Sequence, residues 1–556
     1  MSHPNFKLIE ETLQIALNNL VIWTKNNGSK FSEEKTKVVV FSKRKTKFDL
    51  NLNFNGVNLN VSNEMKLLGM IMDYRLTWKD HIIYTKAKAM KAMNILKILN
   101  NRNNGVNRKV LLRLYKTYVR PIIEYGAPIY NSAPKAILNK LDPIQNTAIR
   151  IATGAFKSSR IENLLVDAGE PPLHIRREYL SNNYMSKVLY NVDNPMRDII
   201  LSISPLDSEI LFQNHPKPLS LWFYENTNNL AEILPDLRLP NNVIPPWTLL
   251  HPKFEAISTK GKKHVLPIEF RNNFYEYLSN KRPSNPNICY TDGSKNDDTI
   301  GAAFKIADLT LNHKLHKMSS SFTAEAFAME FCLSHLIKNN VTGNIIIFTD
   351  SKSLLAAMQQ DVPKNVIIHN IQELSHCILS KGNQITITWI PSHCGIPGNE
   401  EVDLAAKSSN FHTISKQLIL PDLKNFLKSL TKVKWQSWWD NVPFPNKIKN
   451  IKLSVHPWPS SNRTNRLEEK ILCRLRIGHT RLTHKYLMER SDPPICDTCM
   501  ALITVEHLLC DCVKYIRTRQ KFNIYDKQIN EILGDNPPII DKVMKFLKEI
   551  NVYKEI

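Results

Sequence analysis

Four carboxylates in this chain lie in segments whose predicted strands and helices would place them close together in a folded domain: Asp292, Glu325, Asp350 and Asp403. A short apolar run precedes Asp292 and turn residues follow it, which predicts the end of a strand. Asp350 ends the β-branched run 344–349, typical of a strand buried on both faces. Glu325 follows Thr323, a predicted N-cap, in a helical pattern, and Asp403 lies in a second predicted helix. Because open α/β sheets place their sites at the carboxyl ends of strands, we expect the four groups to meet there.

Four acidic groups this close together would repel one another and raise some of their pKa values. A pair of Mg²⁺ ions would remove that conflict, since magnesium takes oxygen ligands and two ions can stabilise the attacking and leaving oxygens of a phosphodiester. Each carboxylate taken singly has an ordinary alternative as a turn residue, a helix cap, a helix-dipole charge or a solvated side chain. The ordered set is more specific, and it indicates nuclease chemistry.

A histidine precedes the last carboxylate. Residues 385–390 are predicted to form a strand, and residues 391–399 a loop rich in turn residues that leads into the helix of Asp403. His393 therefore lies on a loop facing a carboxylate helix, where an imidazole could pass protons to the departing product. The alternative is a histidine that only satisfies hydrogen bonds within the loop.

The motifs at residues 290–294, 324–325, 349–351 and 389–403 together resemble the type 1 ribonuclease H family, over roughly residues 286–410. The resemblance implies a mixed five-stranded sheet flanked by helices, with the four carboxylates as ligands of two Mg²⁺ ions. It also implies cleavage of the RNA strand of an RNA–DNA hybrid. The 2′-hydroxyl distinguishes RNA from DNA, and Gly293, Ser294 and Asn399 are candidates for contacting the substrate.

Some members of that family insert a basic helix and loop after the helix that follows Asp350. Here the connection at residues 360–365 is short and nearly neutral, so affinity must come from elsewhere. The chain has 74 Lys and Arg against 51 Asp and Glu, a net charge of +23, which favours a nucleic-acid partner. Solubility or binding to anionic lipid would give the same charge. Residues 108–120 are predicted to form a helix with one basic face over a buried apolar face.

No run of eighteen apolar residues and no signal peptide is found, so we expect a soluble intracellular protein with no membrane partner. Nuclear residence is compatible with a retroelement product, although no isolated basic signal stands out beyond Lys43, Arg44 and Lys45. At 556 residues we expect a multidomain α/β protein. The predicted regions are 1–80, the helical 81–190, a proline-rich connector at 191–285, the nuclease domain at 286–412, and the helical C-terminal region 413–556.

The N-terminal part resembles reverse transcriptases of jockey-like non-LTR retrotransposons. The matching segments, residues 31–37, 67–82 and 118–127, are similar to the end of the polymerase palm (1–80) followed by the thumb (81–190). The paired catalytic aspartates of that family would lie upstream of residue 1. The only adjacent pair, Asp297 and Asp298, lies within the nuclease region, so we expect no polymerase activity.

Four residues in the segment 496–512 have the spacing of a zinc knuckle: Cys496, Cys499, His507 and Cys512. Three thiolates and an imidazole complete a tetrahedral Zn²⁺ site. Cys510 competes with Cys512 as the last ligand, and the resemblance of residues 474–509 to the C-terminal segment of the same retrotransposon proteins favours Cys512. The other cysteines are dispersed and are read as small buried or free thiols.

Two functions from different classes follow. The first is a Mg²⁺-dependent RNA–DNA hybrid ribonuclease, and the alternative is a catalytically silent, basic nucleic-acid-binding remnant of a retrotransposon. The presence of all four carboxylates and His393 favours the enzyme. An integrase or transposase shares the sheet and the metal chemistry, but its sites lack the Trp-Ile-Pro-Ser-His loop and it ranks low. The sequence does not indicate an oligomeric state.

Overall fold

The computed structural model describes residues 5–42, 50–100, 105–201, 237–238, 244–258, 266–281, 285–297, 299–363 and 365–556. These residues form two compact units. The central unit is built from residues 182–430, and the terminal unit from the two ends of the chain, residues 5–181 and 431–556. The basic segment at Lys43 and much of the predicted connector lie outside the described residues.

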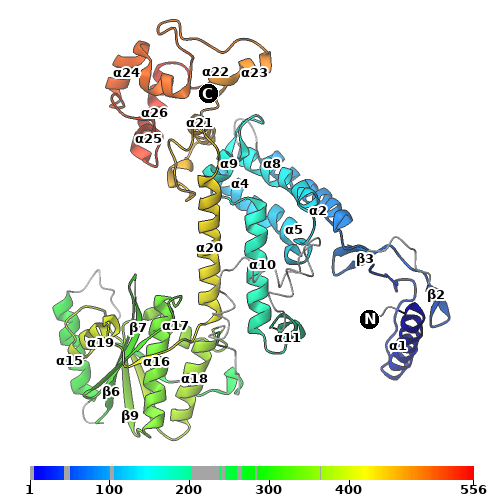
Figure 1. Ribbon diagram of the computed structural model, residues 1–556. Coiled ribbons are helices and arrows are strands. Elements are labelled where there is room, and N and C mark those ends of the chain that lie inside the picture. The colour runs from blue at the N-terminus through cyan, green and yellow to red at the C-terminus, as the bar shows by residue number, and fades with distance from the viewer. Residues whose placement is uncertain are drawn as a thin grey trace. The chain divides into compact units, whose positions relative to one another are not determined.

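A mixed sheet of seven strands, in the order β11-β8-β7-β6-β9-β10-β5, forms the middle of the central unit (Figure 1). Strands β6, β9, β10 and β5 run parallel, whereas β7 is antiparallel to both β6 and β8. The predicted mixed sheet of five strands is confirmed as β6 to β10, and two short edge strands outside the predicted domain, β5 and β11, extend it to seven. The strands are β5 (Lys253–Ala256), β6 (Asn287–Lys295), β7 (Ile300–Ile306), β8 (Leu309–Lys314), β9 (Asn344–Thr349), β10 (Gln384–Trp389) and β11 (Thr413–Ile414).

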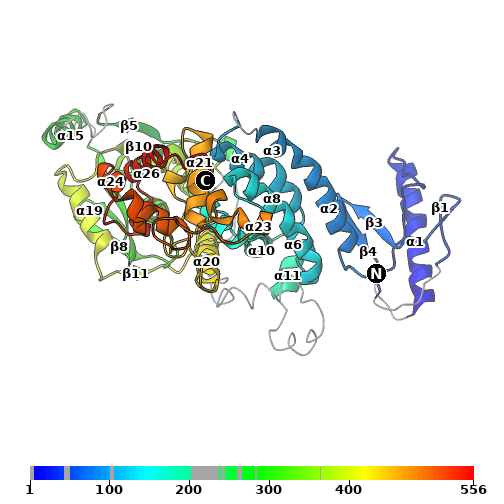
Figure 2. The same ribbon diagram turned by 90° about the horizontal axis from the view of Figure 1, so that it is seen from above.

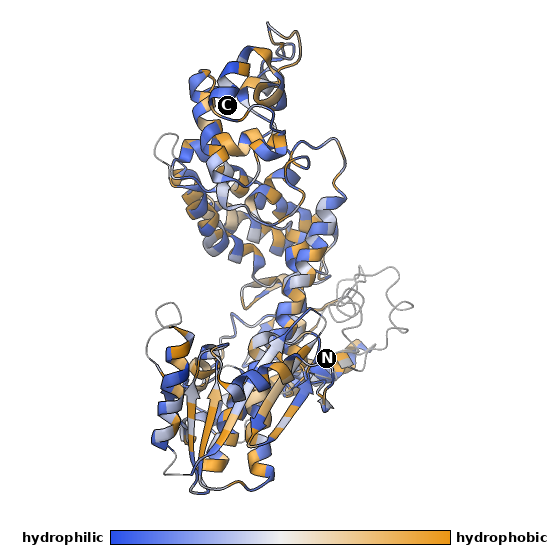
Figure 3. Cartoon of the chain, turned by 90° about the vertical axis from the view of Figure 1, so that its left-hand side faces the viewer, coloured by the Kyte–Doolittle hydropathy of each residue, from blue (hydrophilic) through white to orange (hydrophobic). Residues whose placement is uncertain are grey.

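Helices cover both faces of this sheet, with α16, α17 and α18 on one side and α15 and α19 on the other (Figure 1). Strand β9 shows why: Ile345 and Ile347 pack into the core beneath α16 and α18, while Ile346 and Phe348 pack against Phe274 of α15. The strands are accordingly mostly hydrophobic in Figure 3. The helices of the unit are α11 (Pro195–Leu201), α15 (Pro267–Lys281), α16 (Ser321–Lys338), α17 (Lys352–Met358), α18 (Val366–Leu379) and α19 (Pro397–Lys407).

The terminal unit is mainly helical. Its first part also contains two small antiparallel ribbons, β1 (Leu52–Phe54) with β2 (Val57–Leu59) and β3 (Glu64–Leu67) with β4 (Met70–Asp73). Helices α2, α4 and α8 pack side by side (Figure 2). The helices of this part are α1 (Phe6–Asn26), α2 (Lys79–Ala92), α3 (Asn94–Leu99), α4 (Arg108–Leu114), α5 (Arg120–Glu124), α6 (Ala127–Tyr130), α7 (Lys135–Leu138), α8 (Asp142–Thr153), α9 (Ile161–Ala168) and α10 (Leu173–Tyr190).

The C-terminal segment completes the same unit. Trp439, Cys473 and Ile477 are buried in one core with residues of α2, α4 and α8. A second core surrounds α26, where Val543, Phe546 and Leu547 are inaccessible to solvent. The helices of this segment are α20 (Leu420–Asp440), α21 (Arg466–Ile477), α22 (Arg481–His484), α23 (Tyr486–Glu489), α24 (Ile516–Lys521), α25 (Ile529–Ile532) and α26 (Pro537–Glu549).

Buried ion pairs link the two ends of the chain. Arg108 at the start of α4 pairs with Asp167 of α9 at 2.7 Å, with 3% and 1% of the side chains exposed. The backbone N–H of Arg108 donates to Glu469 of α21, which also pairs with Arg466. A buried charge is costly unless it is paired in this way, so these contacts fix α4, α9 and α21 together.

The basic face predicted for residues 108–120 is only partly exposed: Lys109 and Arg113 are exposed to solvent, whereas Arg108 is buried. Besides Arg108, Lys116 and Arg120 both pair with the buried carboxylate of Glu170. Tyr118, predicted to be buried, is 53% exposed. The helix forms, but much of its charge is neutralised by carboxylates that come later in the sequence. In the described part of the chain, every helix is either too short or too polar to cross a membrane.

Candidate active site

The register of the sheet brings the first two carboxylates together. Thr291 of β6 pairs with Thr349 of β9 in a parallel ladder, so Asp292 and Asp350, the next residues of the two strands, lie at neighbouring positions. Asp292 is buried, with 5% of its surface exposed. The structure therefore places Asp350 at the carboxyl end of a central parallel strand, as the sequence predicts.

Glu325 reaches the same point from the second turn of α16. The hydroxyl of Ser320 caps this helix by accepting from the Thr323 N–H, so Ser320 is the N-cap and the prediction of Thr323 was wrong. Gly293 permits the approach of α16, because a Cβ there would lie 2.1 Å from the backbone N of Glu325. Oxygens of Asp292, Glu325 and Asp350 lie within 4.8 Å of one another.

Asp403 comes from α19 and stands beside this group of three. Its carboxyl hydrogen-bonds with that of Asp292, and the Lys407 ammonium, one turn later, lies 2.7 Å from both Asp403 oxygens. Helix α19 packs closely on β6 because a Cβ at Gly398 would lie 2.3 Å from the Tyr290 ring. The structure thus collects three predicted carboxylates in one cluster and holds the fourth at its edge.

His393 lies on the loop between β10 and α19. Its backbone is left-handed, with φ of 54°, and its side chain is 65% exposed. The Nδ1 atom is 3.8 Å from Asp403 Oδ2, so the imidazole faces the cluster as the sequence predicts. Glu400 stabilises the loop by accepting a hydrogen bond from the Gly395 N–H.

The cluster is strongly disfavoured as a set of free anions. Burial, together with the charges of Asp350 and Asp403, raises the pKa of Asp292 to about 7. Burial and the neighbouring Asp292 and Asp350 raise the pKa of Glu325 well above its usual range. A bound cation would stabilise the ionised form of these buried, mutually repelling carboxylates.

The side chains present fit a hard divalent cation. Glu325 Oε2 is buried without a hydrogen-bond partner among the described residues, and a bound ion would give it one. Oxygens alone make up the donor set, as Mg²⁺ requires. Asp292, Glu325 and Asp350 are the residues that would hold it, and Asp403 lies beside them next to Asp292.

Comparison with known proteins agrees with this geometry. The RNase H family matches residues 284–410, which contain all four carboxylates and His393. These residues form a ribonuclease H domain. The domain accounts for strands β6 to β10 of the sheet, and the edge strands β5 and β11 fall outside the match.

Relatives of the chain are proteins of mobile elements and retroviruses. It is 30% identical over 142 residues to a probable RNA-directed DNA polymerase from transposon BS of Drosophila melanogaster, covering 25% of this chain and 16% of the relative. The RNA-directed DNA polymerase from the mobile element jockey of the same fly is 25% identical over 176 residues, covering 32% and 19%. A Pol polyprotein of the ovine maedi visna related virus (strain South Africa) is 26% identical over 212 residues, covering 35% and 19%. The chain thus matches less than a fifth of the length of each.

These findings are consistent with the C-terminal part of a non-LTR retrotransposon polyprotein.

The predicted substrate-binding residues of the ribonuclease H domain lie in three different settings. Ser294 is half-buried in β6, and Gly293 serves the close packing of α16. Asn399 is only 3% exposed, and its Oδ1 has no hydrogen-bond partner among the described residues. Contact of these residues with substrate stays a prediction.

Two residues that sequence reasoning did not single out support the ribonuclease H site. Trp389, the last residue of β10, donates its indole N–H to the Asp350 carbonyl at 3.1 Å and so fixes the backbone of that ligand. The Lys352 ammonium lies 3.8 Å from the Trp389 ring centroid. Trp389 belongs to the family motif in the sequence, but its role depends on a neighbouring strand and cannot be read from spacing.

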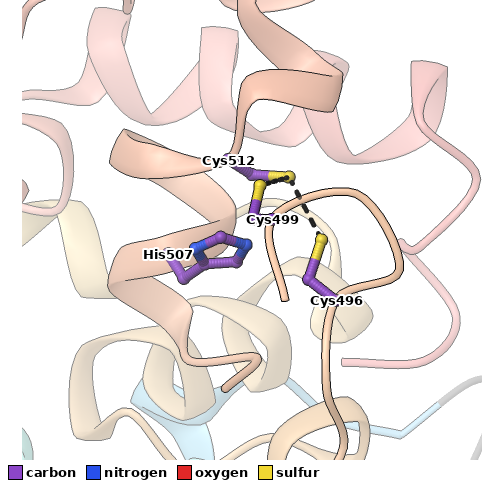
Figure 4. Close-up of side chains that lie close together, drawn as sticks. All are labelled: Cys496, Cys499, His507 and Cys512. Atoms are coloured by element: carbon purple, nitrogen blue, oxygen red, sulfur yellow. Dashed lines mark hydrogen bonds between the residues drawn. The ribbon is translucent and has the colours of Figure 1, made fainter. Parts of the chain in front are cut away.

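A second cluster lies in the terminal unit, where Cys496, Cys499, His507 and Cys512 point toward one another (Figure 4). One ligand atom from each lies within 4.8 Å of the others, and the sulfur of Cys512 is 3.8 Å from those of Cys496 and Cys499. Cys510 is absent from this cluster and packs against the core around α26. His507 Nε2 is buried without a partner among the described residues, which suits a metal ligand.

Proposed function

We propose that the ribonuclease H domain hydrolyses the RNA strand of RNA–DNA hybrids and that it depends on Mg²⁺. The observation that carries this proposal is the convergence of Asp292, Glu325 and Asp350 on one point, with a Glu325 oxygen left without a partner. The match to the RNase H family supports nucleic acid as the substrate class. Hybrid specificity and metal dependence are parts of the proposal.

Each side chain of the site has a separate role in the proposed hydrolysis. Asp292, Glu325 and Asp350 hold the cation, which when bound supplies an activated water and stabilises charge on the phosphate. Lys407 orients Asp403 toward the cluster. His393 is exposed and faces Asp403, so it can deliver a proton to the leaving oxygen of the product. Selection of RNA rests on the 2′-hydroxyl, to which Ser294 at the end of β6 offers a hydroxyl.

A cleavage assay tests the proposal. The full chain is incubated with a hybrid labelled on the RNA strand or on the DNA strand, with and without Mg²⁺. We expect cleavage of the RNA strand alone, only with Mg²⁺, and its loss in Asp350→Asn. Asp361→Asn is the matched control, because Asp361 is exposed after α17, outside the cluster. Absence of cleavage by the wild-type chain would favour the silent nucleic-acid binder, and equal rates in wild type and Asp350→Asn would refute the site.

We propose separately that Cys496, Cys499, His507 and Cys512 bind Zn²⁺. The cluster offers three thiolates and one imidazole, the donor set of a structural zinc site, and such an ion stabilises a small fold. Metal analysis of the purified chain tests this. We expect zinc to be lost in Cys512→Ser and retained in Cys510→Ser, and equal zinc content in these two variants would refute the assignment.

We also propose that these 556 residues do not synthesise DNA. Polymerase activity is named for the relatives, but the chain matches less than a fifth of each. The only adjacent aspartates, Asp297 and Asp298, are in the ribonuclease H domain. Nucleotide incorporation in a primer-extension assay would disprove this.

A further inference from the structure

Two adjoining hollows in the terminal unit are lined by several basic side chains each. The first, about 570 Å³, lies between the end of α8 and α21, with the basic residues Arg150, Lys157, Lys470 and Arg474. The second, about 470 Å³, shares Lys470 and Arg474 with the first and adds Arg481, Lys485 and Lys554. We call the two together the basic groove.

The positive charge of the basic groove is poorly compensated. Among the described residues that line it, Glu489 is the one carboxylate, and it pairs with Lys485 at 2.7 Å. The Arg474 guanidinium donates to the backbone carbonyl of Gly154 and to the backbone oxygen of Ile556, the last residue of the sequence. A groove lined by cations with so few anions attracts a polyanion.

Flat side chains stand among these cations. The rings of His479 and His484 stack with centroids 3.9 Å apart, and the Phe156 ring lies 6.0 Å from His479. Arg474 lies over Phe156 at 4.1 Å. Burial lowers the pKa of His479, and burial with the nearby His479 lowers that of His484 to about 4, so both rings are neutral at pH 7. Neutral rings beside cations make surfaces on which bases stack while the cations contact phosphates.

We propose that the basic groove binds a single-stranded segment of nucleic acid. Stacking on a side-chain ring requires a base face that is not already stacked within a duplex, which favours a single strand over a hybrid. The other basic surface indicated by the sequence, at residues 108–120, is largely neutralised by Asp167 and Glu170. The inference goes beyond the proposed hydrolysis and does not depend on it, because binding and cleavage are measured separately.

The backbone around Gly154 positions Lys470 in the basic groove. Gly154, in left-handed backbone at the end of α8, leaves room for the Lys470 stem, since a Cβ there would lie 2.3 Å from Lys470 Cγ. Lys470 thereby passes the end of α8 and lines both hollows. Lys470 and Arg474 are one turn apart on α21 and present their charge to the same groove.

Fluorescence anisotropy with labelled oligonucleotides tests the proposal. The full chain carrying Asp350→Asn is titrated with single-stranded RNA, single-stranded DNA and the corresponding hybrid over a range of salt concentrations. The hybrid can also bind at the proposed ribonuclease H site, so we expect a change in the groove to affect the affinity of the hybrid less than that of the single strands. In Lys470→Gln/Arg481→Gln their affinity should fall on the order of tenfold, and the salt slope should decrease by about 1.4, or 0.7 for each lost phosphate contact.

Two variants separate the contributions of charge and stacking. Lys109→Gln/Arg113→Gln is the matched control, because it removes two exposed cations of α4 outside the groove and should leave affinity unchanged. Phe156→Leu should weaken single-strand binding roughly fivefold or more without changing the salt slope. The proposal is overturned if the groove and control variants bind the single strands alike.

Discussion

Replacing Asp292 by Asn is expected to stabilise the metal-free ribonuclease H domain while abolishing hydrolysis. The carboxyl is 5% exposed, and burial, Asp350 and Asp403 together raise its pKa to about 7. In the unfolded chain an aspartate titrates near pH 4, so the folded protein holds a proton that the unfolded chain has released. Stability is therefore lost as the pH rises from about 4 to about 7, and no more is lost above that.

The size of this stability loss follows from the pH range over which it occurs. About three pH units, each worth about 1.4 kcal/mol, give on the order of 4 kcal/mol at pH 8. The neutral amide of Asp292→Asn avoids that cost. Between pH 5 and pH 8 the wild type loses stability only up to about pH 7. The difference in unfolding free energy between the variant and the wild type should therefore grow by about 3 kcal/mol between these two measurements. That corresponds to about 6–12 °C in Tm.

Calorimetry of the full chain in magnesium-free buffer at pH 5 and pH 8 measures the effect. Added Mg²⁺ should raise the Tm of the wild type and leave Asp292→Asn nearly unchanged, because a bound ion stabilises only a protein that can hold it. Asp361→Asn, which removes an exposed carboxylate, should show no pH-dependent gain. A variant no more stable than wild type at pH 8, or a difference independent of pH, would refute the reasoning.

Three further substitutions test the supports of the two units. Gly293→Ala should destabilise the central unit by about 1–3 kcal/mol and slow hydrolysis, because α16 must move away with Glu325; thermal unfolding and the cleavage assay measure both. Asp167→Asn should cost about 3–5 kcal/mol in urea unfolding, because Arg108 stays buried without its partner. Trp389→Phe should lower the Tm by about 1–6 °C and reduce the cleavage rate, because the hydrogen bond to the Asp350 carbonyl is lost; an unchanged rate would show that this bond does not position the ligand.

The sequence alone predicted the centre of the ribonuclease H domain well. Strand β9 is a continuous run of buried β-branched residues, and the position of Asp350 at its end follows from that run. The proximity of Asp292 then follows from pairing with a parallel neighbour. Such elements are predictable because one short segment contains the whole signal.

Features that depend on distant partners were not predictable. Strand β5 has four residues in a proline-rich region and exists because it pairs with β10, more than a hundred residues later. The cations of residues 108–120 read as a solvent-facing surface because Asp167 and Glu170, the carboxylates that pair with them, come later in the chain. At the start of α16, Ser320 and Thr323 are both good caps and residue type does not decide between them, whereas in the structure the Ser320 hydroxyl accepts the Thr323 N–H.

Because the terminal unit is built from both ends of the chain, it cannot fold completely until the C-terminal segment has been synthesised. Domains generally fold as units while the ribosome advances. The ribonuclease H domain can be complete once residue 410 has emerged, whereas α4 and α9 must wait for α21 to bring Glu469. A message truncated shortly after residue 430 would therefore yield a finished nuclease joined to helices that lack their last neighbours, and such a product should be degraded from its N-terminal side.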